Sequence, residues 1–515
     1  MFNNFLTIDK ATIRDINLHE SMAYENDVLL NRIWYAGDAN LIEQYFKKLA
    51  GINNNAVSKD RFWAAIPMQG MGIRKIHSGL PQEIVNVLSD IIISDMDKVK
   101  IENETYNEAW EAISGDEEDG IDIREIVQDA ITETLVTGDG AFKISIDTSI
   151  SNIPQVEFYS GEEVKYEYHG NKVKKIKFYT RYNKGKKSYI LEETYYRGGI
   201  DYKLYNEKEK EVPLEEVEEL KDLRPVEFSD KSLFLAVPCM FYKSSKYKGR
   251  GKSIYDNKTE LFDAFDEAIS AWTDAERDNR AKNYIPEDMF PHDPETGETL
   301  QPNPFQFRFI RISGGVELGK DTIATNQGSI DFQAHQANII SKRDQCIEGI
   351  ISGATLGFNV SADASGESQK EKKDTTIITR NHITARLEKV IRKLVIAIIK
   401  AKYQVEGRII TDDIVVDFTF GEYSRLSFDD KIRTLASARP GEAIISKETI
   451  INELWGDSKS EEWKAEELAR LETEQSIIDI QPFHRDDEDL FGGFSDEDKE
   501  AINSDNNKEE PTVEE

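Results

Sequence analysis

The sequence predicts an α+β fold built from several packed modules. Its 515 residues exceed the length at which one hydrophobic core stops growing. Apolar residues recur at helical spacing in several segments, whereas residues 141–205 alternate between apolar and polar in short runs. Helices on both sides of an antiparallel meander indicate the α+β class.

Residues 27–94 are expected to be mostly helical, ending in the apolar run 84–93. The polar, acidic residues 114–120 interrupt this pattern, and a helix is expected over residues 123–136. The turn sequence Gly138-Asp-Gly140 then predicts entry into a strand at residues 141–146. The period of the apolar residues therefore changes from helix to strand at this point.

The meander is predicted from alternating runs and the turn residues between them. The charged residues 207–223 follow it and are expected to form a solvated insertion. The runs are residues 156–159, 173–180, 188–196 and 201–205, and the turns are residues 170–171, 183–185 and 198–199.

A long amphipathic helix is expected from residue 258, because an apolar stripe leaves a face of acidic residues. Residues 284–328 hold five of the 14 prolines and predict an irregular module with some β structure. Helical spacing returns from residue 332 to a Gly/Ala/Ser-rich segment, residues 353–366. The acidic face comprises Asp263, Asp266, Glu267, Asp274 and Glu276.

The longest helix is expected over residues 367–404, followed by a strand at 414–420 and by small helices, one of them capped by Ser446. The last segment, residues 485–515, has 13 acidic and three basic residues, a net charge of −10, and few large apolar ones. Such a composition predicts disorder.

The charge and composition exclude several classes of protein. Lys+Arg 65 against Asp+Glu 97 gives −32, which argues against general DNA binding through neutralised phosphates. Two cysteines, Cys239 and Cys346, predict neither a disulfide framework nor a structural zinc site. The N-terminus lacks a signal sequence and no segment has a membrane-spanning apolar run, so we expect a protein made in the cytoplasm with no membrane contact.

Three local motifs are weaker than they first look. Residues 249–253 end like a phosphate-binding loop. The motif also requires a glycine five residues before Gly251, and that position is Lys246, so we expect no nucleotide site and no cofactor. A calcium loop around Gly120 would place Gly115 and Ile126 at ligand positions, and their side chains cannot bind a calcium ion. A DNA-binding helix-turn-helix within residues 429–455 would have a second helix with one lysine and two glutamates. This helix is poorly suited to contact DNA phosphates, so structural packing is favoured.

Residues 365–404 carry ten Lys/Arg and four acidic residues, a local excess of +6. Two interpretations remain open. The basic face pairs with acidic neighbours, or its start beside the flexible segment faces a polyanion. The cluster of basic residues at 243–252 is expected to pair with acidic neighbours or a partner subunit.

The order of these elements resembles the portal proteins of tailed bacteriophages, in the branch of long-tailed phages of Gram-positive hosts. The likeness spans residues 30–474, and the order and spacing of its motifs carry it together. The motifs are Trp34-Tyr-Ala-Gly-Asp38, Lys75-Ile-His77, Gly79-Leu-Pro81, Gly138-Asp-Gly140-Ala-Phe-Lys143, Gly251-Lys-Ser253, Glu260-Leu-Phe-Asp-Ala264 and Ser352-Gly-Ala-Thr-Leu-Gly357.

The resemblance implies a multi-module portal fold. Its modules would be an N-terminal and wing region (1–256, helices plus an antiparallel sheet), a first stem helix (257–281), a small α/β clip (282–330), a second stem helix (331–353), a tunnel loop (354–366), a long spine helix (367–404), a wing return strand (405–426), a helical crown (427–478) and an acidic disordered tail (479–515).

The resemblance also implies functional residues. Asp263, Glu267 and Asp274 would lie on the stem channel wall, and His292, Asp293, Glu295 and Glu298 would contact the motor and adaptors through the clip. The tunnel loop and its DNA-facing neighbours would be Leu356, Phe358, Asn359, Val360, Ser361, Asp363, Lys370, Lys372 and Lys373.

The implied function is a ring, usually of twelve subunits, at one capsid vertex of the virion. Double-stranded DNA would enter through it during packaging and leave during ejection. Its partners would be the terminase motor, the major capsid or scaffolding protein and head-tail adaptors, and no metal or catalytic residue is expected. The alternative is an acidic adaptor or scaffold of the phage head that does not surround DNA.

Overall fold

The computed structural model describes residues 24–52, 61–65, 74–115, 120–146, 151–185, 187–279, 282–286, 292–297, 309–312, 324–326, 328–358, 374–410, 412–421, 446–455 and 461–480. The chain divides into two compact units, Met1–Tyr423 and Ser424–Glu515. Helices and largely antiparallel sheets confirm the predicted α+β class. Among the described helices, none combines the length and apolar character that crossing a bilayer requires.

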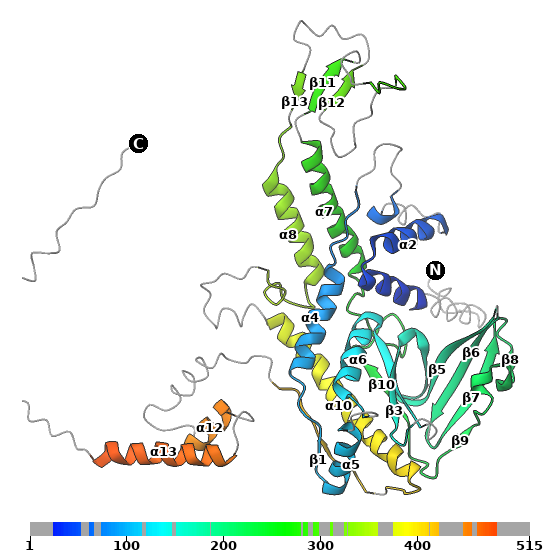
Figure 1. Cartoon of the computed structure of the whole chain (residues 1–515), viewed down its shortest axis with the longest axis vertical. Coiled ribbons are helices and arrows are strands. Elements are labelled where there is room, and N and C mark those ends of the chain that lie inside the picture. Colours follow the sequence, from blue (N-terminus) through cyan, green and yellow to red (C-terminus); the bar gives the residue numbers. More distant parts are fainter. Residues whose placement is uncertain are drawn as a thin grey trace, which may run out of the picture. The chain divides into compact units, whose positions relative to one another are not determined.

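Helices make up most of the described residues before residue 137, as the periodicity predicts (Figure 1). In α4 the buried side chains Ile84, Leu88 and Ile92 recur every four residues and form one face. The helices are residues 24–36, α2 (Ala39–Ile52), the 3₁₀ turn η1 (Phe62–Ala64), α4 (Leu80–Ser94), α5 (Glu104–Ser114) and α6 (Ile123–Thr137).

The helix expected over residues 123–136 is confirmed as α6. Asp122 caps its start by accepting hydrogen bonds from the N–H groups of Arg124 (3.0 Å) and Glu125 (3.1 Å). Gly138 ends it with a φ of 100°, a conformation that favours glycine. The chain therefore passes from α6 into the first long strand without a loop.

Two antiparallel sheets follow (Figure 1). In the three-stranded sheet, β2 (Asp139–Ser145) lies between β3 (Gln155–Ser160) and β10 (Ala236–Met240). The larger sheet confirms the predicted runs 173–180, 188–196 and 201–205 and the turns between them. The run 156–159 instead belongs to β3 of the three-stranded sheet, and the strand at residues 164–169 was not predicted. The larger sheet contains β4 (Val164–His169), β5 (Lys172–Lys184), β6 (Lys187–Tyr196), β7 (Gly199–Asn206) and β8 (Glu211–Val212), with β9 (Val226–Glu227) paired to β7.

The charged segment 207–223 is not the simple solvated insertion that its composition predicts. It forms β8 and two short 3₁₀ turns, η3 (Leu214–Glu216) and η4 (Glu218–Leu220). Val217 and Leu220 are buried against Leu191 and Leu204 of the large sheet. Val217 and Leu220 decide the position of the segment, because their burial outweighs the solvation of the charges around them.

The second half of the first unit begins with a pair of helices, α7 (Thr259–Asp278) and α8 (Phe332–Ile347), which pack against each other (Figure 1). Between them in the chain lies a sheet of β11 (Lys282–Pro286), β12 (Phe309–Ile312) and β13 (Ala324–Asn326). β11 pairs parallel with β12 and antiparallel with β13. The described residues of this module contain no helix, so its predicted α/β character is confirmed only for the strands.

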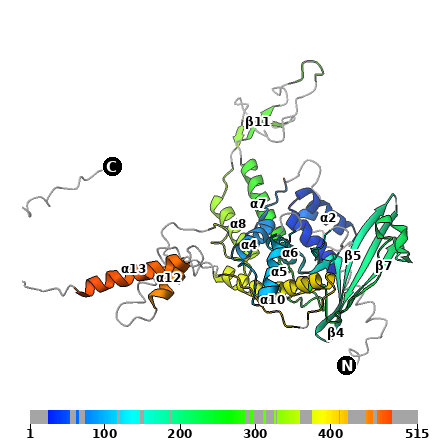
Figure 2. The ribbon, with the colours of Figure 1, turned by 60° about the horizontal axis from the view of Figure 1, so that its bottom comes forward.

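The long helix expected over residues 367–404 is confirmed from Asp374, where the description resumes, as α10 (Asp374–Val405). It runs from α4 towards the large sheet (Figures 1 and 2). Ile383, Leu387, Leu394 and Ile398 are fully buried along it. The strand expected at residues 414–420 is shorter: β14 (Val416–Asp417) pairs with β1 (Lys100–Ile101), and Phe420 bridges to Met96.

The second unit contains α12 (Lys447–Trp455) and α13 (Glu461–Ile480). Ser446 caps α12 as predicted, because its Oγ accepts a hydrogen bond of 3.1 Å from the N–H of Thr449. Trp455 and Trp463 pack edge to face at 5.4 Å between ring centroids. Residues 429–455, which were weighed against a helix-turn-helix, lie largely outside the described residues, as does the acidic tail after residue 480.

Candidate functional site

Acidic residues of α7 hold the N-terminal segments against this helix. Asp263 accepts hydrogen bonds from the N–H groups of Phe62 (3.1 Å) and Trp63 (3.2 Å). Asp266, three residues further on, accepts from the indole Nε1–H of Trp63 (3.1 Å) and the N–H of Ser78 (3.0 Å). These charge-assisted bonds are the stronger kind, and they fix two segments to one helix.

His77 completes this arrangement. Its Nδ1 lies 2.8 Å from Asp266 Oδ2, and its ring packs between those of Trp34 and Trp63, at 5.6 and 6.4 Å between centroids. One turn after Asp266, the Oγ of Ser270 accepts a hydrogen bond of 3.0 Å from the N–H of Ile76. We call Asp263, Asp266, Ser270, Trp63 and His77 the α7 clamp.

The clamp corrects one sequence-based expectation. Asp263 and Asp266 are 7 % and 0 % exposed, so they do not belong to a solvated acidic face, and Asp263 is not free to line a channel. Glu267 is exposed and Asp274 is half-buried. Asp266 follows Phe262 by four residues, which places it at the edge of the apolar stripe. This position in the sequence could have indicated that Asp266 is buried.

The expected tunnel-loop residues are described only in part. Leu356 was predicted to be an exposed, DNA-facing side chain. It is instead 9 % exposed and belongs to the main core. Phe358 is half-buried beneath the guanidinium of Arg343, which lies 4.1 Å from its ring centroid. The remaining predicted residues lie outside the described ones: Asn359, Val360, Ser361, Asp363, Lys370, Lys372 and Lys373.

The expected clip residues His292, Asp293 and Glu295 lie in one short turn, residues 292–297, while Glu298 falls outside the description. His292 and Glu295 are exposed. Asp293 accepts a hydrogen bond of 2.8 Å from the N–H of Glu295, which lowers the pKa of the Asp293 carboxyl. The turn thus presents a histidine and two carboxylates together to solvent.

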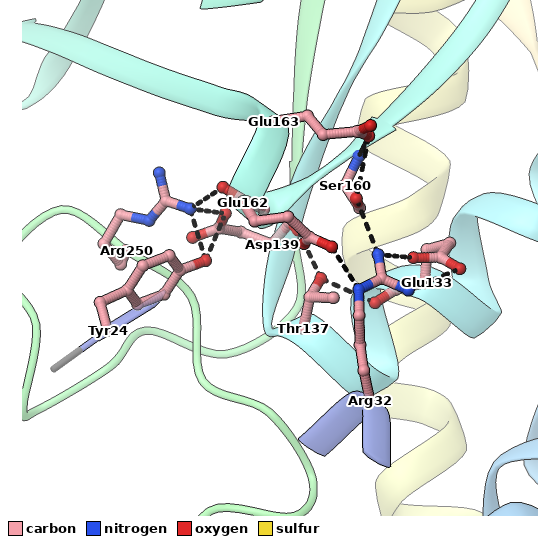
Figure 3. Close-up of polar contacts among 10 residues, drawn as sticks. Tyr24, Arg32, Glu133, Thr137, Asp139, Ser160, Glu162, Glu163 and Arg250 are labelled. Carbon is pink, nitrogen blue, oxygen red and sulfur yellow. Dashed lines mark hydrogen bonds and ion pairs between the residues drawn. The ribbon is translucent and has the colours of Figure 1, made fainter. Parts of the chain in front are cut away.

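The loop that ends like a phosphate-binding motif is committed to internal contacts (Figure 3). Arg250 forms an ion pair of 2.9 Å with the fully buried Asp139 and also donates to the oxygens of Tyr24 and Gly161. Burial raises the pKa of Asp139, and Arg250 offsets part of that rise. Ser253 Oγ donates to the carbonyl of Leu135 at 3.1 Å, so the loop presents no free anion cradle.

A second guanidinium extends this network (Figure 3). Arg32 pairs with Glu133 of α6 at 2.7 Å and with Glu162, and it donates to Ser160 Oγ at 2.9 Å. The helix at residues 24–36, α6 and the end of β3 are thereby joined. The two carboxylates that face this arginine, Glu133 and Glu162, make a structural junction between these elements.

Two residues of the basic cluster at residues 243–252 pair with acidic neighbours, as one interpretation of the sequence predicts. Lys246 forms an ion pair with Asp27, in addition to the Arg250–Asp139 pair. Across the described residues, no group of three or more His, Cys, Asp and Glu side chains could hold a metal ion.

The basic residues of α10 divide between the two interpretations of that segment. Arg380 is buried in an ion pair of 2.9 Å with Asp95, and Arg392 donates to the carbonyl of Phe418 at 2.7 Å. Arg386, Lys389 and Lys393 are exposed, and none of them pairs with an acidic side chain among the described residues. Pairing with neighbours therefore accounts for part of the basic excess only.

Large apolar side chains are exposed on α8 and α10. On α8, Phe332 is 55 % and Ile340 is 37 % exposed, and on α10 Ile378 is 70 % exposed. Among the described elements, α8 packs chiefly against α7, and its residues up to Gln345 are exposed or half-buried. These exposed apolar side chains are available for contact with another chain.

Two solved structures to which the chain is similar are necks of GTA particles. The neck of the native particle, computed with C12 symmetry, has 10% identity and a TM-score of 0.37. The neck of the empty particle, computed with C6 symmetry, has 9% identity and a TM-score of 0.38. Each likeness covers 73% of this chain and 89% of the other.

No family model matches this chain, and no curated protein matches it.

Proposed function

We propose that this chain is one subunit of the ring-shaped DNA portal of a tailed bacteriophage, and that its role is structural, without enzymatic activity. The observation that supports this most directly is the helix pair α7 and α8. The pair carries a separate small sheet between its helices in the chain, and α8 leaves Phe332 and Ile340 exposed. In the proposed ring, this pair is the stem and the small sheet is the clip.

Ring formation gives those apolar side chains a partner. Fully burying a Phe or Ile side chain contributes about 1.5–3 kcal/mol, and every copy in a closed ring gains this contribution at the same interface. A monomer would leave the same surface in water. The proposed assembly is a homo-oligomer of twelve subunits at one vertex of the capsid.

The charge of the chain fits passage of DNA better than its capture. With a net charge of −32, and with Glu267 exposed on the stem, the surface repels phosphate within a Debye length of about 10 Å. Repulsion keeps duplex DNA from adhering to the channel during packaging and ejection. Occasional contacts would come from the proposed tunnel loop.

The energy for moving DNA would come from a separate ATPase, the terminase motor. In support, the one loop with a partial nucleotide-binding pattern uses Arg250 and Ser253 for internal contacts. The exposed turn with His292, Asp293 and Glu295 is proposed to contact the motor and, later, the head-tail adaptors.

A cross-linking experiment tests the channel role. A photoreactive side chain at Ser361 in particles stalled during packaging is expected to cross-link to duplex DNA. The same side chain at Lys203, which is exposed on β7 of the large sheet, is expected not to do so. Equal labelling at both residues, or no labelling at Ser361, would favour the acidic adaptor or scaffold that does not surround DNA.

A further inference from the structure

A pocket of about 580 Å³ lies between α10 and the edge of the large sheet. Its walls come from four parts of the chain that are distant in sequence: the start of β5, the turn before β7, residues 232–238 and the last turns of α10. The ribbon in Figure 2 shows α10 reaching the sheet at this end. No step of the proposed DNA passage uses this pocket.

Four basic side chains line it: Lys172, Arg197, Lys393 and Lys400. Lys400 has a distant acidic neighbour, with Nζ 4.0 Å from Asp230 Oδ2, and Arg197 donates to the carbonyl of Ser232 at 3.2 Å. Within the described part of the chain, Lys172 and Lys393 have no ion-pair partner. A concentration of positive charge is therefore left uncompensated on a protein of net charge −32.

Apart from Asn171 and Ser232, the remaining residues that line the pocket are apolar. Val173, Leu233, Val237 and Ile396 contribute to this apolar surface, together with Phe234, whose ring lies 5.9 Å from the guanidinium of Arg197. A few cationic groups around an apolar floor make a site that selects an anionic ligand with a large apolar group. A simple anion would contact only the cationic side chains and would leave the apolar surface of the pocket exposed to water.

We propose that this pocket binds an acidic segment of a partner protein that carries one large apolar side chain. Carboxylates of the segment pair with the lysines, and the apolar side chain lies against Ile396 and Phe234. The proposal does not depend on the ring or on DNA passage.

The apolar floor distinguishes this ligand from nucleic acid. Duplex DNA offers phosphates to proteins on its outer surface and has no protruding apolar group to enter the pocket. Arg386 and Lys389, which extend the basic surface along α10, do not line the pocket. A polyanion would use all of these residues alike, whereas a peptide seated in the pocket would depend on Lys172 and Lys393.

Fluorescence anisotropy on the purified full-length chain tests the proposal. The probe is a labelled peptide of alternating aspartate and glutamate with one central phenylalanine, and the matched probe carries serine instead. We expect saturable binding of the first and binding at least about tenfold weaker for the second, since tenfold corresponds to about 1.4 kcal/mol, less than full burial of the ring contributes.

Two charge reversals at exposed residues provide the variants. The combined Lys172→Glu and Lys393→Glu change is expected to weaken binding of the phenylalanine peptide at least about tenfold. Arg386→Glu, on the same face of α10 but outside the pocket, is the matched control and is expected to change it less than about twofold.

Several results would overturn the proposal. They are no saturable binding, equal affinity for the serine peptide, an equal loss in Arg386→Glu, or displacement of the peptide by duplex DNA at equal charge. A change in the size of the oligomer in the Lys172→Glu and Lys393→Glu variant would also overturn it, because the occupant would then be a second copy of the chain.

Discussion

At the scale of single residues, buried acids decide how the N-terminal segments attach to α7. Asp266 is completely buried and accepts three polar contacts, from Trp63, His77 and Ser78. The sequence placed Asp266 among the solvated carboxylates, because helical spacing identifies a face but not what covers it. The covering segments precede α7 by almost 200 residues, so no local pattern could reveal them.

Replacing Asp266 by Asn is expected to lower the free energy of unfolding by about 2–3 kcal/mol, because buried donors lose a charged acceptor. Chemical denaturation monitored by tryptophan fluorescence measures the change, and Trp63 reports on the site directly. Glu267→Gln is the matched control, since this neighbour is exposed and its change should stay within about 0.5 kcal/mol. An equal effect of both variants would contradict the role of the clamp.

Asp256, in the turn before α7, predicts a dependence of stability on pH. Burial raises the pKa of Asp256 to about 6 from 3.8. A carboxyl whose pKa is higher in the folded state favours folding in its neutral form. This contribution is therefore fully present below about pH 4 and is lost as the pH rises through about 6.

Asp256→Asn is accordingly expected to stabilise the protein at pH 7 by about 1–2 kcal/mol, a value reduced for the partial exposure of the group. At pH 4 the two proteins should have similar stability. Thermal unfolding of both at pH 4, 5, 6 and 7 measures the difference. A constant difference across this range would show that Asp256 does not titrate with the raised pKa.

At the scale of elements, helices and strands with strong periodicity were predictable. The strands β5 to β7 and the helices α6 and α10 lie where apolar spacing and turn residues placed them, whereas β4 was not predicted. The segment 207–223 was not predictable, because Val217 and Leu220 are sparse among charges and their burial depends on a sheet formed elsewhere. In the candidate site, the helices were predictable, but the burial of the Asp263 and Leu356 side chains was not.

The exposed face of α8 leads to a prediction about assembly. Phe332→Asp combined with Ile340→Asp is expected to shift the purified chain from large oligomers to smaller species, because charges would replace about 1.5–3 kcal/mol of burial per side chain. Sedimentation velocity measures the size, and circular dichroism should remain unchanged because both residues are exposed in the single chain.

Asn338→Asp is the control, since it adds one charge at an exposed residue on another side of α8. It is expected to leave the oligomer intact. Dissociation by Asn338→Asp alone would assign the effect to added charge and not to the apolar residues.

At the scale of the whole molecule, the distribution of charge carries more information than its sum. Of the net −32, −10 lies in residues 485–515, while exposed lysines and arginines gather on α10. The sequence predicted a basic excess there, and the structure separates it into buried pairs and an unpaired surface. That division depends on which side of α10 packs against the core, which local composition does not specify.

The central claim is that copies of this chain form a ring around a channel. Electron microscopy of the purified full-length chain tests it most directly. We expect closed rings with a central hole wide enough for duplex DNA. A chain that remains monomeric at every concentration and ionic strength tested would contradict it.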